Sequence, residues 1–154
     1  MRVEIPRLHR DGEWFEGVEP GEVLKLGDDV AMAPAGEISY RLFVQAVSDE
    51  LVVSGEVRMA LRFVCARCAE TFVCEVADSE FVRAYELAAA TEFVDLTDDI
   101  REAIILALPA NPLCRSDCKG LCHACGANLN EGACMCGPSP GDRRWEALGG
   151  VDWT

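Results

Sequence analysis

Histidine, basic residues and long apolar runs are scarce in this 154-residue sequence, and each shortage excludes a class of protein. With only His9 and His123 available, no Ser/His/Asp or Cys/His catalytic arrangement is convincing. The longest apolar run, residues 103–110, is too short to cross a bilayer. Residues 1–6 contain no apolar export signal, so we expect a soluble cytoplasmic protein that has no membrane partner.

The basic residues are outnumbered by acidic ones, and the imbalance lies in one part of the chain. The formal net charge is −13. Residues 1–113 carry 10 Lys and Arg against 22 Asp and Glu, whereas residues 114–154 carry 4 against 5. Counterion release from phosphates needs clustered Lys and Arg, so we do not expect the first part to bind nucleic acid tightly.

Two stretches have the alternating pattern of half-buried β-strands. In residues 38–47 the apolar side chains fall at every second position, and the same alternation continues from Leu51 to Cys65. The first stretch would place on one face Ile38, Tyr40, Leu42, Val44 and Ala46. Residues 1–36 are interrupted by glycine and proline, so we expect only short strands and loops there.

A third strand is expected from Phe72 onward. Its inward register shifts between residues 77 and 80, which predicts a bulge or a bend. Cys74 fits the apolar alternation of this strand, so we interpret it as a small buried side chain rather than a reactive thiol.

The period changes to a helical one in residues 97–108. Thr97 is the expected N-cap, and Asp98 and Asp99 occupy the first turn, where the helix dipole favours carboxylates. Pro109 then ends the helix. The sequence therefore predicts an α+β fold, with a mainly antiparallel β body, one helix and a C-terminal zinc-knuckle module.

Nine cysteines are too many to ignore, and their odd number rules out a complete set of internal disulfides. Eight of them occur in short-spaced clusters, which in a chain without an export signal indicates metal binding. These eight are Cys65, Cys68, Cys114, Cys118, Cys122, Cys125, Cys134 and Cys136. Two structural zinc ions are therefore expected, because four sulfurs around each ion leave no open position for a substrate.

We assign the first site to Cys65, Cys68, Cys114 and Cys118, and the second to Cys122, Cys125, Cys134 and Cys136. Structural zinc sites are usually built from two short ligand pairs, which favours this division. A division that places residues 114–125 around one ion stays open. Gly126, directly after a ligand pair, suits the positive φ that such a turn often needs.

The same cysteines allow a sharper interpretation. Residues 118–125 contain the spacing CxxxCxxC, which some radical enzymes use to hold an iron–sulfur cluster, but those enzymes need a much larger barrel than this chain. A thiol redox enzyme is also weakly supported, because thiolates held by zinc cannot exchange freely. An acidic zinc-ribbon adaptor in transcription or another complex is the stronger alternative.

Basic and aromatic side chains gather only near the cysteines. The candidate contacts for RNA or a protein partner are Arg67, Arg115, Lys119, Arg143, Arg144 and Trp145. Scattered solvated charges are the competing explanation. We divide the chain into an acidic β-rich body (1–113), a cysteine-rich zinc module packed on it (114–136) and a C-terminal tail (137–154).

In order along the chain, these features resemble the YceD family, also called domain of unknown function 177. They are Cys-Ala-Arg-Cys at 65–68, the helix that ends before Pro109, Pro-Leu-Cys at 112–114 and the run from Asp117 to Cys136. The resemblance implies a role in accumulation or processing of large-subunit (23S) ribosomal RNA, with no known catalytic activity and no small-molecule substrate. It also implies two separate cysteine sites, because some members lack the second knuckle.

The implied role and the acidic charge are reconciled if the body meets a basic partner. Such a partner would be a large-subunit ribosomal protein or a precursor particle, and charge complementarity would speed docking. Direct contact with RNA would then fall to the nearly neutral cysteine module.

Overall fold

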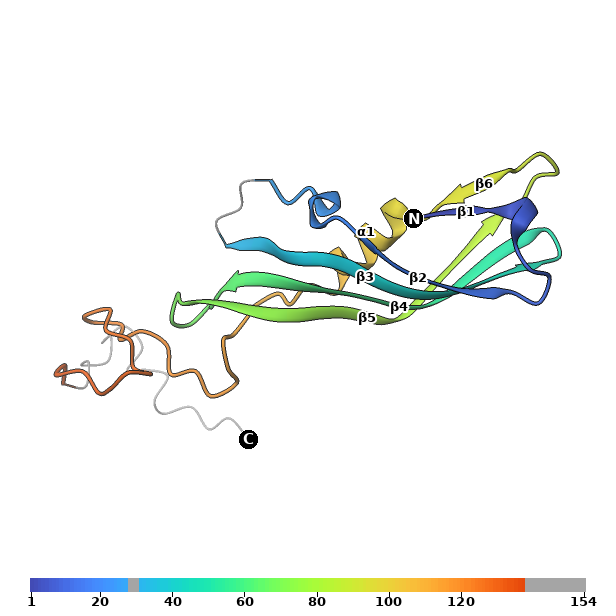
Figure 1. Cartoon of the computed structure of the whole chain (residues 1–154). Coiled ribbons are helices and arrows are strands. Elements are labelled where there is room, and N and C mark those ends of the chain that lie inside the picture. Colours follow the sequence, from blue (N-terminus) through green and yellow to red (C-terminus); the bar gives the residue numbers. More distant parts are fainter. Residues whose placement is uncertain (28–30, 138–154) are drawn as a thin grey trace, which may run out of the picture.

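The computed structural model describes residues 1–27 and 31–137. Four antiparallel strands form the main sheet in the order β2-β3-β4-β5, and a pair of three-residue strands, β1 and β6, forms a second sheet (Figure 1). The strands are β1 (Arg2–Glu4), β2 (Glu13–Glu19), β3 (Met32–Val47), β4 (Glu50–Val64), β5 (Thr71–Glu86) and β6 (Phe93–Asp95). The helices are the 3₁₀ turns η1 (Ile5–Arg7) and η2 (Gly21–Leu24) and the α-helix α1 (Thr97–Leu106). The predicted α+β class is confirmed.

The core forms on one face of the main sheet, because side chains alternate between the two faces of a strand. On β4, the odd-numbered side chains Leu51, Val53, Val57, Met59, Leu61 and Phe63 are buried, as their alternation predicted. Helix α1 covers this face and contributes Ile100 and Ile104, both fully buried. The helical spacing of apolar residues in the sequence predicts an amphipathic helix, and in the structure its apolar side packs against the core residues of the main sheet.

A bulge interrupts the pairing of β4 with β5, as the shift in register predicted. Gly55 pairs with Phe81 and Val57 pairs with Asp78, so β5 holds one residue more than β4 across this interval. An extra residue on one strand bends that strand locally. Gly55 itself has a φ of +153°, and a Cβ there would lie 2.2 Å from the Arg41 carbonyl oxygen, so only glycine fits.

Several local predictions are wrong. Cys74 is exposed, although it pairs with fully buried Leu61, because it lies on the edge strand β5 and has a neighbouring described strand on one side only. Ala46 is exposed near the end of β3, whereas Tyr40, although only half-buried, packs against the core with Ile38 and Leu42 as predicted. Thr97 is the first residue of α1 and not its N-cap, since the N-cap position is held by Leu96.

The cysteine-rich segment lies beyond one end of the main sheet, in line with the long axis of the strands (Figure 1). It follows α1 through 107–113 and contains an isolated β-bridge between Leu121 and Asn128 but no strand in its described residues. The hairpin turn between β4 and β5 points toward it, which places Cys65 and Cys68 beside the later cysteines.

Candidate metal centres

The first centre begins in the turn that joins β4 to β5. The Cys65 amide donates to the Glu70 carbonyl (2.8 Å), and the Ala69 amide donates to the Cys65 carbonyl (3.0 Å). Ala69 adopts a positive φ of 58°, which closes the turn tightly. Both sulfurs of the knuckle therefore point to the same side.

Backbone hydrogen bonds bring the segment after the helix alongside this turn, and one of them comes from Leu121, whose amide donates to the Arg67 carbonyl (3.0 Å). The Ala66 amide donates to the Pro112 carbonyl (2.9 Å), and the Cys114 amide then donates to Cys65 Sγ (3.4 Å). Cys118 follows after one more turn, in which the Cys118 amide donates a hydrogen bond to the Arg115 carbonyl (3.1 Å).

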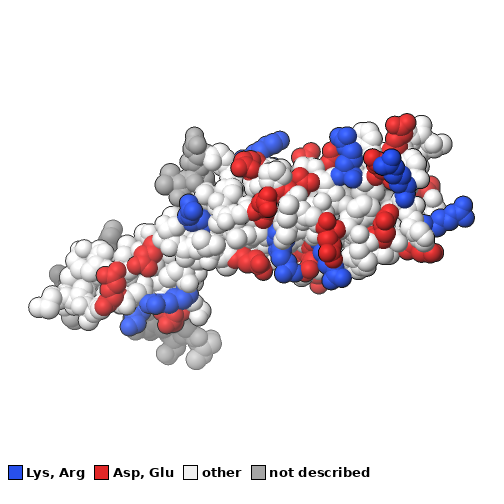
Figure 2. Space-filling view, viewed as in Figure 1, with Lys and Arg blue, Asp and Glu red and all other residues white. Residues whose placement is uncertain are grey.

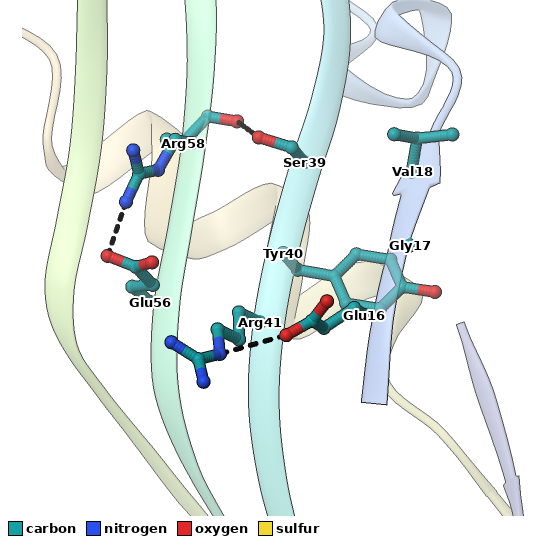
Figure 3. Close-up of a pocket in the computed structure, with 8 residues that line it drawn as sticks. All are labelled: Glu16, Gly17, Val18, Ser39, Tyr40, Arg41, Glu56 and Arg58. Carbon is teal, nitrogen blue, oxygen red and sulfur yellow. Dashed lines mark hydrogen bonds and ion pairs between the residues drawn. The ribbon is translucent and has the colours of Figure 1, made fainter. Parts of the chain in front are cut away.

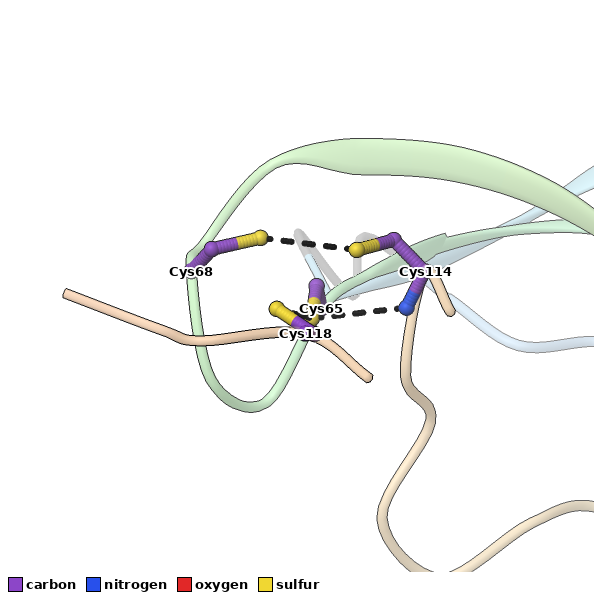
Figure 4. Close-up of side chains that lie close together, drawn as sticks. All are labelled: Cys65, Cys68, Cys114 and Cys118. Carbon is purple, nitrogen blue, oxygen red and sulfur yellow. Dashed lines mark hydrogen bonds between the residues drawn. The ribbon is translucent and has the colours of Figure 1, made fainter. Parts of the chain in front are cut away.

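Together these contacts bring four sulfurs within 4.8 Å of one another (Figure 4). We call this group cluster one; it consists of Cys65, Cys68, Cys114 and Cys118. Sγ of Cys65 lies 3.8 Å from Sγ of Cys118, and Sγ of Cys68 lies 3.7 Å from Sγ of Cys114. Four sulfurs at zinc–sulfur distances of about 2.3 Å in a tetrahedron would stand about 3.8 Å apart. The spacing of cluster one therefore fits a tetrahedral ion of that size.

The surroundings of cluster one favour thiolate at two positions. Burial opposes ionisation of Cys65, but amides that include those of Cys114, Cys68 and Arg67 outweigh it and lower the Cys65 pKa to about 6. The Asn130 side chain, which donates to Cys118 Sγ (3.4 Å), lowers the pKa of Cys118. Burial and the neighbouring sulfurs raise the pKa of Cys114 to about 12. A cation is what would allow all four thiols to ionise together.

Cluster two consists of Cys122, Cys125, Cys134 and Cys136, whose sulfurs again lie within 4.8 Å of one another. Two hydrogen bonds of 2.8 Å close its knuckle: the Cys122 amide donates to the Ala127 carbonyl, and the Gly126 amide donates to the Cys122 carbonyl. Gly126 has the positive φ that its position predicted, 72°. Amides of Cys125 and Ala124 lower the Cys122 pKa to about 6.

The structure thus brings the eight cysteines together as the two groups of four that their spacing predicted, and it does not bring residues 114–125 around one point. The clusters differ in burial. Cys65, Cys68 and Cys118 are at most 4% exposed, whereas Cys125 and Cys136 are exposed. His123 is exposed and belongs to neither group.

One residue that the sequence analysis missed connects the two centres. Asn130, in the turn between the ligand pairs of cluster two, donates to Cys118 Sγ of cluster one and accepts from the Lys119 amide (2.8 Å). Asn128 reaches back to Glu70 of the first knuckle (2.7 Å). The signal was present as an Asn-Leu-Asn turn, but its partners lie in segments that only the fold brings close.

The predicted contact residues are distributed unevenly. Arg67 donates to the Cys118 carbonyl (3.0 Å), and Arg115 donates to Asn130 (2.8 Å) and pairs with Asp117 (3.4 Å). Lys119 is exposed beside them. Arg143, Arg144 and Trp145 lie outside the described residues.

The main sheet carries more than one hollow. One of about 480 Å³ lies over β2, β3 and β4, where Arg41 pairs with Glu16 (2.9 Å) and Arg58 pairs with Glu56 (2.5 Å) (Figure 3). These charges are already matched within the protein, so the hollow does not present a convergent set of free reacting groups. Among the described helices, none has the length and apolar character to span a membrane.

Comparisons with known proteins support the family resemblance. The profile of the family described as "Large ribosomal RNA subunit accumulation protein YceD" matches residues 75–151. A Mycobacterium tuberculosis protein, itself called uncharacterized, is 30% identical over 154 residues, covering 84% of this chain and 70% of the relative. No solved structure is similar enough to count as a match.

Two plant proteins carry a functional name. The "Large ribosomal RNA subunit accumulation protein YCED homolog 1, chloroplastic" of Arabidopsis thaliana is 38% identical over 58 residues, which is 38% of this chain and 18% of the plant protein. Its Zea mays namesake is 43% identical over 51 residues, or 32% of this chain and 17% of that protein. With a family profile that spans half of its length, this chain belongs to the YceD family.

Proposed function

We propose that this protein is a non-enzymatic accessory factor in the biogenesis of the large ribosomal subunit, in which two zinc ions hold the cysteine-rich end in shape. The proposal rests on membership of a family described by accumulation of large ribosomal RNA. It places the protein in the bacterial cytoplasm, where ribosomes are assembled.

The two cysteine clusters support a structural use of zinc. Four sulfurs occupy every position of a tetrahedral site, so no position is open to a water molecule or a substrate. Cys65, Cys68, Cys114 and Cys118 would hold one ion, and the four sulfurs of cluster two would hold the other. Zinc supplies no chemical step here; it closes segments that have few apolar side chains of their own.

Charge favours a basic protein or precursor particle as the partner. Acidic side chains are spread over the body in the view of Figure 2, with basic ones among them. The net charge of −13 would accelerate encounter with a basic surface and oppose contact with bare phosphates. The residues proposed to contact RNA are Arg67, Arg115 and Lys119 near the clusters, together with Arg143, Arg144 and Trp145.

A deletion strain tests the proposal. We expect less mature large subunit and less of its RNA, while small-subunit levels hold, when lysates are separated on sucrose gradients during slow and fast growth. The intact gene should restore the ratio. An unchanged ratio of large to small subunits under both conditions would refute the assembly role. Co-sedimentation of the protein with transcription complexes, and not with precursor large subunits, would favour the zinc-ribbon adaptor instead.

A further inference from the structure

In the described part of the chain, the main sheet ends at β5, and no strand pairs with the outer edge of β5. β5 is 16 residues long, and within the described residues β4 is its only strand neighbour. Figure 1 shows it running along the border of the sheet. An edge strand presents backbone N–H and C=O groups without a partner in the sheet, and an extended segment of another chain can pair with them.

The bulge limits how much of this edge is regular. Pairing with β4 is continuous from Thr71 to Asp78 and shifts only beyond that point. Eight uninterrupted residues match the length of a typical strand in a globular protein. Residues 71–78 are therefore the part to which a further strand can be added without a break in register.

The side chains along this edge leave apolar surface unfilled on both faces of the sheet. Val73 is 60% exposed on the open face. On the opposite face, Cys74 is exposed although its neighbour Leu61 on β4 is fully buried. A strand added beside β5 would bring its own alternating side chains against both positions.

Charge on β5 indicates which occupant fits. Among the described residues, Glu75, Glu80 and Glu86 form no ion pair. The other edge of the sheet differs, because on β2 Glu16 pairs with Arg41 and Glu19 binds the amino group of Met1. These three carboxylates of β5 thus have no direct ion pair, and Arg58 is close enough to Glu75 only for a charge interaction smaller than its own pairing with Glu56, whereas two of the three glutamates on β2 are paired.

The same charge disfavours a second copy of the chain. Two β5 edges placed side by side would bring their unmatched carboxylates together, and like charges across a strand pair are destabilising. A basic segment would meet no such repulsion.

We propose that the β5 edge, over residues 71–78, is a docking site for an extended basic segment of a partner protein, which adds to the main sheet as a fifth strand. Main-chain hydrogen bonds would hold the segment, and its lysine or arginine side chains would face Glu75 and the acidic side chains beyond it. The inference depends on the proposed function only for the identity of the partner.

Binding of a synthetic probe tests the edge directly. The probe is a capped peptide of about eight residues in which lysine and valine alternate. Amide hydrogen exchange should slow at alternate residues of 71–78 when the probe is added, and should not change in β2. Two further probes carry N-methyl groups on alternate amides, one probe on the odd-numbered amides and the other on the even-numbered ones. Methylation removes main-chain donors but keeps the charge. Whichever set of amides faces β5, one of the two probes lacks those donors, so at least one should fail to bind.

Charge reversal gives an independent measurement. Glu75→Lys with Glu80→Lys should weaken probe binding by about tenfold at low salt. Glu22→Lys with Glu37→Lys changes the net charge equally at exposed positions away from β5 and should have a much smaller effect. Thermal unfolding of each variant checks that the fold is kept. Binding of both N-methylated probes as tightly as the unmethylated probe, or protection outside β5, would overturn the proposal.

The cellular assay separates this inference from the proposed function. If the β5 variant binds the probe more weakly, as expected, and also fails to restore large subunits in the deletion strain, the edge serves that role. If it restores them fully, the edge is not the docking site used in assembly, although the assembly role stands. A deletion strain with normal subunits would refute the assembly role and leave the probe measurements unaffected.

Discussion

At the scale of single residues, position relative to the clusters matters more than residue type. Nine cysteines look alike in the sequence, yet eight converge in two groups and Cys74 stands apart on an exposed strand edge. Its Sγ contacts only the adjacent Glu75 carbonyl (3.4 Å) among the hydrogen bonds of the described residues.

Cys74→Ala should therefore leave two zinc ions per chain. Because the side chain is exposed, the free energy of unfolding should change by no more than about 0.5 kcal/mol. Elemental analysis of the purified variant, with the wild type as reference, measures the zinc content. A content of one ion would show that Cys74 is a ligand and that the division into clusters is wrong.

Asn130 is the residue through which one cluster supports the other. Asn130→Ala removes the donor to Cys118 Sγ and the acceptor for the Lys119 amide. Loss of such a hydrogen bond behind a metal ligand typically weakens metal affinity by about 10- to 100-fold. We expect this loss at cluster one, measured by competition with a chromophoric chelator.

Asn111→Ala is the matched control, because Asn111 is exposed and takes no part in either cluster. Equal metal affinity in the two variants would mean that Asn130 has no supporting role. The cysteine ligand pairs could be predicted because each pair is local in sequence. Asn130 could not, since its contact with Cys118 spans 12 residues and depends on how the module folds back.

At the scale of elements, the long strands could be predicted and the short ones could not. β4 repeats its alternation over 15 residues, which fixes its face and its register with β3 and β5. β1 and β6 have three residues each, too few to show a period, and they pair only because the fold brings the chain's beginning to the start of α1. The start of β3 at Met32 could not be predicted either, because Pro34 and Gly36 interrupt the alternating pattern there.

The start of α1 shows how a neighbouring carboxylate replaced the predicted cap. Asp95 accepts hydrogen bonds from the Thr97 amide (3.0 Å) and the Thr97 hydroxyl (2.6 Å), and it pairs with Arg2 (3.6 Å). The Thr97 hydroxyl in turn accepts from the amino group of Met1 (2.8 Å). Asp95 thus ties the first residues of the chain to the helix.

Asp95→Ala should lower the free energy of unfolding by about 1 kcal/mol at neutral pH, as loss of a capping carboxylate usually does. Hydrogen bonds from the Thr97 side chain and amide lower the pKa of Asp95 below its usual value. The carboxylate therefore contributes stability above its unfolded pKa of about 4 and loses that contribution as the pH falls through the lowered folded pKa.

The stability difference between wild type and Asp95→Ala should accordingly shrink at about pH 3, measured by urea unfolding of both proteins at each pH. Asp98→Ala serves as a control, because Asp98 is exposed in the same first turn without these hydrogen bonds. A difference that stays constant with pH would contradict a role for the ionised Asp95 carboxylate.

At the scale of the whole molecule, the two clusters have different structural consequences. Cluster one packs against Phe72, whose ring lies 6.0 Å from that of Phe63 in the main core. It also joins the β4–β5 turn to a segment 46 residues later, Cys68 to Cys114, so that it closes a long loop. Cluster two closes only the local segment from Cys122 to Cys136, and no core residue of the body lies against it among the described contacts.

Cys65→Ser and Cys134→Ser should therefore differ, although each removes one sulfur. We expect Cys134→Ser to lose one zinc ion and keep the thermal unfolding midpoint of the body, because the core over β4 does not depend on cluster two. Cys65→Ser should lose the other ion and lower that midpoint, since it opens the long loop and exposes the end of the sheet. Structural zinc can contribute about 10 kcal/mol or more to the folding of a small module, so both losses should be plain in elemental analysis and circular dichroism.

A chelator added to the wild type should remove zinc in the matching order, first from the more exposed cluster two and then from cluster one. Simultaneous release of both ions, or equal midpoints in the two variants, would show that the clusters form one cooperative unit instead of a local and a long-range tie.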